Sequence, residues 1–107
     1  MNVTITGRHL RITDDMKDYA RDRAERMSKY FERIKKIEVV LSAEGDHYTA
    51  EIIVACVRGM VLVGHVRDYK MAAAVDLVVD KLERQLTRFK ERLKNKRPRR
   101  RATAEEE

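Results

Sequence analysis

The spacing of apolar residues changes twice along this chain of 107 residues, and these changes limit the folds that it can adopt. From residue 14 to 32, apolar side chains recur every three or four positions, which places them on one face of a helix. Thr13 precedes this segment as an expected N-cap, and acids occupy its first turn. From residue 37 to 66, apolar and polar side chains alternate, which is typical of strands with one buried face. From about residue 70 to 95 the helical spacing returns, with apolar residues at Val75, Val79, Leu82, Leu86, Phe89 and Leu93.

Short breaks divide the alternating region into three strands, and a fourth strand precedes the first helix. The breaks are "EGDH" and "RG", and the early strand is "NVTITG". Consecutive strands joined by such short breaks are expected to pair antiparallel. Two helices with one apolar stripe each and a sheet with one apolar face can cover each other in two layers. The sequence therefore predicts an α+β fold of order β-α-β-β-β-α, a two-layer sandwich with both helices packed on one face of a four-stranded sheet.

The end of the chain differs in composition from the rest. Pro98 follows the second helix, and the final stretch "RPRRRATAEEE" has no apolar periodicity. We therefore expect one domain over residues 1–96, followed by a flexible, charged C-terminal tail over residues 97–107.

Positive charge is concentrated in the second helix and the residues after it. Residues 80–101 hold eleven Lys or Arg against three acids, whereas residues 1–79 hold thirteen against twelve, so the excess that gives a net charge of +6 lies near the C-terminus. At about 100° per residue, the basic positions of the helix fall on one side and its acidic positions on another. The basic positions are Lys81, Arg84, Arg88 and Arg92, and the acidic ones are Asp76, Asp80, Glu83 and Glu91. Such a sorted surface suits the phosphates of a nucleic-acid backbone, with salt-dependent affinity and little base specificity.

The first helix carries cations on one flank of its apolar face, at Arg23, Arg26 and Arg33. We expect this flank to combine with the second helix into a basic groove between the two helices. A charged, soluble surface with no partner is the alternative explanation for these cations. The four tyrosines are expected mostly at the margins of the core rather than in base stacking, and they are Tyr19, Tyr30, Tyr48 and Tyr69.

No pattern in the sequence supports catalysis or a cofactor. The three His residues are widely spaced and match no metal-ligand motif, so we expect no metal site. Cys56 is the single cysteine and falls in an expected apolar strand, where it should pack as a small hydrophobic residue. A lone cysteine forms no intramolecular disulfide, which fits a cytoplasmic setting. We also expect no small-molecule substrate and no membrane association, since no apolar run approaches the roughly 18 residues of a membrane span.

The stretches "MNVTITGRHLRITDDMKDYA" and "ERMSKYFERI" resemble the first strand and first helix of the ribosome hibernation-promoting factor and ribosome-associated inhibitor family. The stretch "MAAAVDLVVDKLERQLTRFKERLK" is similar to the family's motif "MYAAIDxxxDKLxRQLxKxK". The resemblance covers about residues 2–95. It implies a non-enzymatic stress protein whose partners are the small ribosomal subunit and its ribosomal RNA. In this family the protein lies between head and body of the subunit, where messenger and transfer RNA would lie, and so inhibits translation.

The resemblance also implies which residues contact ribosomal RNA. Three basic residues of the second helix match the family's motif, at Lys81, Arg84 and Arg88. Arg23 matches a position in the first helix that is commonly basic in the family. Helical geometry adds Arg26 and Arg92 to this set.

The chain departs from the family's pattern in three respects. The family has an acid where Lys70 stands and a Tyr where Ala72 stands, so Asp68 becomes the candidate cap of the second helix. The second domain of the family's long forms is missing, so the chain resembles a short form, which we expect to be a monomer away from the ribosome. Whether it promotes or opposes ribosome pairing stays open.

Two other functions are compatible with a basic helical face. A free-standing double-stranded RNA binding module also combines three antiparallel strands with two helices, but it needs a loop that reaches a second groove, and "EGDH" is short and acidic. Docking of the basic helix on an acidic partner or a membrane surface is the third possibility. The apolar stripe of that helix is expected to pack on the sheet, which leaves little of it for lipid.

Overall fold

The computed structural model describes residues 2–94, apart from the side chains of Tyr30 and residues 92–94. The elements are β1 (Asn2–Arg8), α1 (Asp14–Tyr30), β2 (Ile34–Glu44), β3 (His47–Cys56), the 3-10 turn η1 (Val57–Gly59), β4 (Val61–Asp68) and α2 (Met71–Lys94). This order confirms the predicted β-α-β-β-β-α arrangement. The predicted tail over residues 97–107 lies outside the described residues.

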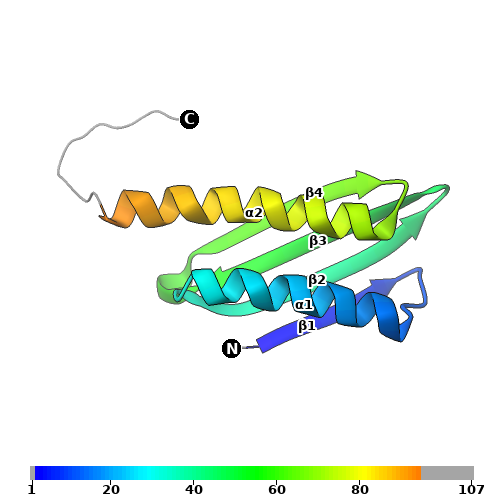
Figure 1. Ribbon diagram of the computed structural model, residues 1–107, viewed down its shortest axis with the longest axis horizontal. Coiled ribbons are helices and arrows are strands. Elements are labelled where there is room, and N and C mark those ends of the chain that lie inside the picture. The colour runs from blue at the N-terminus through cyan, green and yellow to red at the C-terminus, as the bar shows by residue number, and fades with distance from the viewer. Residues whose placement is uncertain (1, 95–107) are drawn as a thin grey trace.

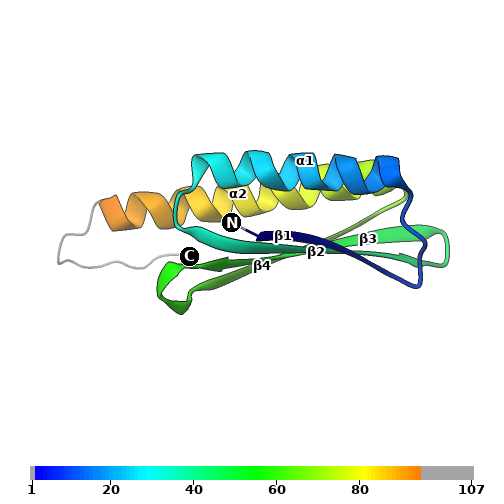
Figure 2. The ribbon, with the colours of Figure 1, turned by 90° about the horizontal axis from the view of Figure 1, so that it is seen from below.

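The four strands form one sheet in the order β1-β2-β3-β4. Strand β1 pairs parallel to β2, because α1 carries the chain back across the sheet between them. Strands β2, β3 and β4 pair antiparallel through short connections, as the sequence predicts. Both helices lie on one face of this sheet, with α1 over β1 and β2 and α2 over β3 and β4 (Figures 1 and 2). The two-layer sandwich is therefore confirmed.

The helix ends follow from local hydrogen bonds. Thr13 Oγ1 accepts a hydrogen bond from Met16 N at 3.2 Å, which is the expected N-cap of α1. Helix α1 ends at Tyr30, slightly before the predicted residue 32, because Phe31 takes an extended conformation that leads into β2. At the start of α2, Asp68 Oδ1 accepts a hydrogen bond from Lys70 N at 3.0 Å. This bond holds the turn that leads into α2, but Lys70 precedes the helix, so the bond is not the expected helix cap.

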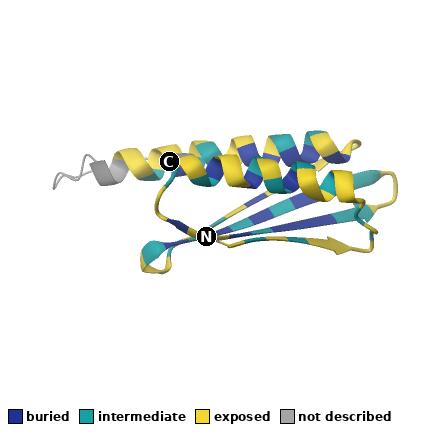
Figure 3. Ribbon diagram, turned by 60° about the horizontal axis from the view of Figure 1, so that its bottom comes forward, coloured by how far each residue is buried: buried dark blue, intermediate teal, exposed yellow. Residues whose placement is uncertain are grey.

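Apolar side chains of both layers meet in one core between the helices and the sheet. Figure 3 shows the buried stretches of the helices and strands in dark blue, facing this inner layer. The largest fully buried side chains are Met27, Ile37, Leu41, Ile52, Leu82, Val39, Val54, Val75 and Val78. Cys56 is 3% exposed in the same core, and burial raises the pKa of its thiol. The prediction that Cys56 packs as a small hydrophobic residue is confirmed.

Helix α2 packs closely against Gly64 in β4. A Cβ atom at this position would lie 2.9 Å from Leu82 Cγ and 3.0 Å from Val78 Cγ2. Both neighbours are fully buried, so they have little room to move. The absence of a side chain at Gly64 therefore sets the distance and the rotation at which α2 packs on the sheet.

We predict that Gly64→Val lowers the free energy of unfolding by about 1–3 kcal/mol, because the added methyl groups overpack the contact with α2. Urea unfolding followed by circular dichroism measures the change. His65→Val is the matched control, since it places valine at the next position of β4, where the side chain is exposed. Equal stability of the two variants would contradict the close-contact explanation.

Candidate nucleic-acid interface

Three of the predicted RNA-binding residues share one side of α2. Lys81, Arg84 and Arg88 are all exposed, and at about 100° per residue they lie within roughly 60° of one another around the helix axis. We call these three residues the α2 stripe. Arg92 belongs to the same helix, but its side chain lies outside the described residues.

The residues of the α2 stripe differ in their ion pairing. Arg84 Nη2 lies 2.8 Å from Asp80 Oδ2, one helical turn earlier, so the predicted separation of acids and bases is incomplete at this point. Both side chains of this pair are more than half exposed, and such surface pairs contribute about 0–1 kcal/mol. Within residues 2–94, no acidic side chain forms an ion pair with Lys81 or Arg88. Among the described residues, Lys81 and Arg88 therefore have no ion-pair partner, and Arg84 can leave Asp80 at little cost.

The surface beside the stripe is slightly hollowed. A shallow depression of about 380 Å³ is lined by Glu83, Arg84, Thr87 and Arg88. Two of the four lining residues are cations of the stripe, and the hydroxyl of Thr87 is a further hydrogen-bond donor. A phosphate group placed here could receive charge-assisted hydrogen bonds from both arginines.

Arg23 occupies a different position, between the two helices. Its Nη2 atom lies 2.9 Å from Asp76 Oδ1 in α2 and donates to the Tyr19 hydroxyl at 3.3 Å. Tyr19 in turn donates to the same Asp76 oxygen at 2.6 Å. The hydrogen bond with Tyr19 and the nearby charge of Asp76 raise the pKa of Arg23 despite its partial burial. We call Tyr19, Arg23 and Asp76 the helix clasp, because they connect α1 to α2.

Arg26 lies on the exposed surface of α1. Its side chain is 61% exposed, and its Nε atom lies 3.4 Å from Asp22 Oδ2, one turn earlier in the same helix. This pair is weak for the same reason as the Arg84 pair. Arg26 is therefore accessible to a partner, but on a different helix from the α2 stripe.

The helix clasp shows which flank of α2 faces α1. Asp76 contacts α1 directly, and Lys90 lies on nearly the same flank, with its ammonium 5.9 Å from the ring centre of Phe31. Lys81 is five residues after Asp76, which places it about 140° further around the helix, and Arg88 is about 120° away. The α2 stripe therefore points away from α1. The α2 stripe and the cations of α1 therefore do not face each other across the helix pair, and Asp76 lies on the side of α2 that faces α1.

One aromatic residue near this surface is more exposed than predicted. Tyr69, expected at the margin of the core, is 67% exposed in the connection between β4 and α2. Its position two residues before an amphipathic helix gave no indication of burial or exposure. Leu77, which is 48% exposed, lies on the side of α2 that carries the stripe.

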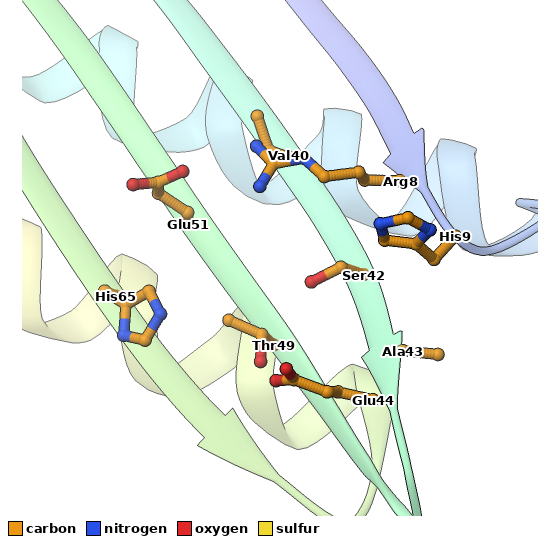
Figure 4. A pocket seen from close by; sticks show the side chains of 9 residues that line it. All are labelled: Arg8, His9, Val40, Ser42, Ala43, Glu44, Thr49, Glu51 and His65. Carbon is orange, nitrogen blue, oxygen red and sulfur yellow. The ribbon is translucent and has the colours of Figure 1, made fainter.

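A second concave surface lies on the open face of the sheet, opposite the helices. This depression of about 330 Å³ is lined by residues of all four strands and the turn after β1, including Arg8, Glu44, Glu51 and His65 (Figure 4). Its formally charged side chains are one arginine and two glutamates, whereas the depression beside the α2 stripe has two arginines and one glutamate, so the depression on the sheet suits a phosphate less well. Within residues 2–94, no three His, Cys, Asp or Glu side chains are grouped so that they could hold a metal ion. The helices of the described part also lack the length and apolar character needed to cross a membrane.

Comparison with known proteins identifies related chains. A family model described as "Sigma 54 modulation protein / S30EA ribosomal protein" matches residues 3–94. The ribosome hibernation promoting factor of Azotobacter vinelandii is 35% identical over 92 residues, which cover 86% of this chain and 85% of that protein. The factor of the same name from Escherichia coli strain K12 is 33% identical over 94 residues, which cover 88% of this chain and 98% of that protein.

Two solved structures have the same fold. The N-terminal domain of Protein Y from Thermus thermophilus is 36% identical, with a TM-score of 0.74, and the match covers 83% of this chain and 99% of that domain. A ribosomal subunit interface protein from Coxiella burnetii has a TM-score of 0.78 at 21% identity, covering 85% of this chain and 99% of that one. Because the family model spans nearly the whole described chain and several relatives exceed 30% identity, the chain belongs to the S30EA family of ribosome hibernation promoting factors, which are not enzymes.

Proposed function

We propose that this protein is a cytoplasmic ribosome hibernation factor that binds the small ribosomal subunit through the α2 stripe and inhibits translation by occupying the path of messenger and transfer RNA. Membership of the family supports a role at the ribosome. The observation that carries the binding mode is the solvent-facing stripe, in which Lys81 and Arg88 have no ion-pair partner among the described residues.

The proposed contact is electrostatic. Each Lys or Arg that neutralises a phosphate releases counterions from the RNA, so affinity falls steeply as salt rises. Arg84 must give up Asp80 to reach a phosphate, but this exposed pair is weak enough to exchange at little cost. Three cations spaced by three and four residues along one helix can follow successive phosphates of a backbone without reading the bases.

The structure offers little to the alternative of a double-stranded RNA binding module. Such a module needs a loop that reaches a second groove, whereas β2 and β3 are joined by a turn of two residues, Gly45 and Asp46. Competition between small subunits and generic duplex RNA separates the two functions. A ribosome factor is displaced by subunits at far lower concentrations than by duplex RNA.

We predict that changing Lys81, Arg84 and Arg88 together to Glu abolishes co-sedimentation with small ribosomal subunits, because phosphate contacts become repulsive. The fold should persist, since all three side chains are exposed. Sedimentation through sucrose at low and moderate salt measures binding, and circular dichroism checks the fold.

The matched control for this variant changes Lys17, Lys35 and Lys36 to Glu. These residues are also exposed, lie on α1 and β2, and alter the net charge by the same amount, from +6 to 0. Retention of binding by the control, with loss in the α2 variant, locates the contact on α2. Equal binding by both variants would remove the stripe from the interface.

A second prediction concerns Arg23, whose proposed RNA contact competes with the helix clasp. We expect Arg23→Gln to lower the free energy of unfolding by about 1 kcal/mol, because the half-buried clasp loses its charge pair. Arg88→Gln should leave stability unchanged and instead reduce the slope of log affinity against log salt by about one. Urea unfolding and salt titrations of subunit binding provide the two measurements. If Arg23→Gln instead keeps its stability and reduces the slope of log affinity against log salt as much as Arg88→Gln does, Arg23 contacts phosphate directly.

A further inference from the structure

Tyr69 is the most exposed of the large hydrophobic side chains in the described part of the chain, at 67%. Its ring stacks on the imidazole of His47, with ring centres 4.4 Å apart and planes inclined by 29°. Tyr69 comes from the connection between β4 and α2, and His47 is the first residue of β3, after the turn from β2. Figure 1 shows both connections at the same end of the sheet. We call Tyr69 and His47 the aromatic pair.

The aromatic pair is held in place from both sides. His47 Nδ1 lies 2.8 Å from Asp46 Oδ1, which orients the imidazole. Asp68 Oδ1 accepts a hydrogen bond from Lys70 N, which fixes the backbone on either side of Tyr69. A ring that is already oriented loses little conformational entropy when a flat ligand binds it. His47 covers one face of the Tyr69 ring. Tyr69 is nevertheless largely exposed, so part of its surface remains open to a second flat group.

The aromatic pair lies next to the first turn of α2, the helix that carries the α2 stripe. Lys70 directly follows Tyr69 in the chain. Leu77 comes seven residues after Lys70, and the three stripe residues follow at further steps of four, three and four residues. Leu77, Lys81, Arg84 and Arg88 therefore lie on one side of α2, and Lys70 immediately precedes its first residue. Between Met71 and Lys81 the helix rises about 15 Å, which a few nucleotides of a single strand can span.

We propose that Tyr69, backed by His47, is a stacking platform for an unpaired nucleobase of an RNA strand whose phosphates lie along the α2 stripe. This inference rests on the proposed function and adds a base contact to its phosphate contacts. Every nucleobase has a flat face that stacks on an aromatic ring, and single-stranded segments of RNA present such bases. Leu77 gives the strand an apolar contact between platform and stripe.

Charge contributes little at the platform itself. The chain next to the aromatic pair carries two cations, Arg67 and Lys70, and two carboxylates, Asp46 and Asp68, so its formal charges balance. Stacking rather than counterion release therefore provides the affinity there, and its contribution does not depend on salt. This difference separates the platform from the α2 stripe in one experiment.

The chain contains no Trp, so Tyr69→Trp introduces a single fluorescent indole at the platform. We expect a single-stranded oligoadenylate to quench this fluorescence, and an abasic oligonucleotide of equal length and charge to bind without quenching. Anisotropy of labelled oligonucleotides verifies that both are bound. Equal quenching by the two oligonucleotides, or none at saturation with oligoadenylate, would overturn the proposal.

Binding to small ribosomal subunits gives an independent test. Tyr69→Ala should weaken binding about tenfold or more at every salt concentration, and Tyr69→Phe should recover most of that loss because the ring is restored. Val61→Ala is the matched control, since it removes a 54% exposed apolar side chain from the other end of β4 and should bind as the wild type does. Urea unfolding verifies that all variants fold.

The remaining outcomes also decide the question. Wild-type binding by Tyr69→Ala, together with loss in the charge-reversed α2 variant, would refute the platform and leave the proposed function intact. Loss in Tyr69→Phe as large as in Tyr69→Ala would show that the hydroxyl acts, not the ring face. Weak subunit binding by Tyr69→Ala, without quenching of the introduced indole by RNA in Tyr69→Trp, would point to a ribosomal protein as the partner and overturn the nucleobase assignment. If the charge-reversed α2 variant binds normally, the proposed function fails, while quenching by oligoadenylate still tests the platform.

Discussion

The packing of α2 on β3 and β4 determines which of its residues can meet a partner. Gly64 lets Val78 and Leu82 rest directly on the strand, and a side chain there would push the helix outward or rotate it. A helix turned by one residue would move every side chain by about 100° around the axis. The solvent-facing position of Lys81 and Arg88 thus depends on an apolar contact made on the other side of the same helix.

The charged residues of the two helices lie in different surroundings. The acidic flank of α2 faces α1, where Asp76 joins Arg23 and Tyr19 in the helix clasp. The α2 stripe faces outward; among residues 2–94, Lys81 and Arg88 have no ion-pair partner and Arg84 pairs weakly with Asp80. Cations that look equivalent in the sequence therefore differ in their surroundings: Arg23 joins the helices, whereas Lys81 and Arg88 face solvent. Because Asp76 is engaged in the helix clasp, its carboxylate does not neutralise the α2 stripe.

The sequence predicted those features that depend on neighbouring residues. Thr13 caps α1, because this interaction involves residues three positions apart. The alternating strands and the two helical stretches determined the order of elements and the layers. The pairing of Arg23 with Asp76, in contrast, joins residues 53 positions apart and depends on the side of α1 that α2 packs against. The stacking of Tyr69 on His47 likewise joins two separate connections, and no spacing in the sequence indicates it.

A structure of the protein bound to the small ribosomal subunit, determined by electron cryomicroscopy, shows whether the α2 stripe lies on ribosomal RNA. In the proposed binding mode, side-chain nitrogens of Lys81, Arg84 and Arg88 lie within hydrogen-bonding distance of phosphate oxygens of ribosomal RNA, at about 2.7–3.2 Å. Arg84 has then left Asp80, while α2 keeps its packing on the sheet. A complex in which the α2 stripe faces solvent, and the open face of the sheet contacts the RNA, would contradict it.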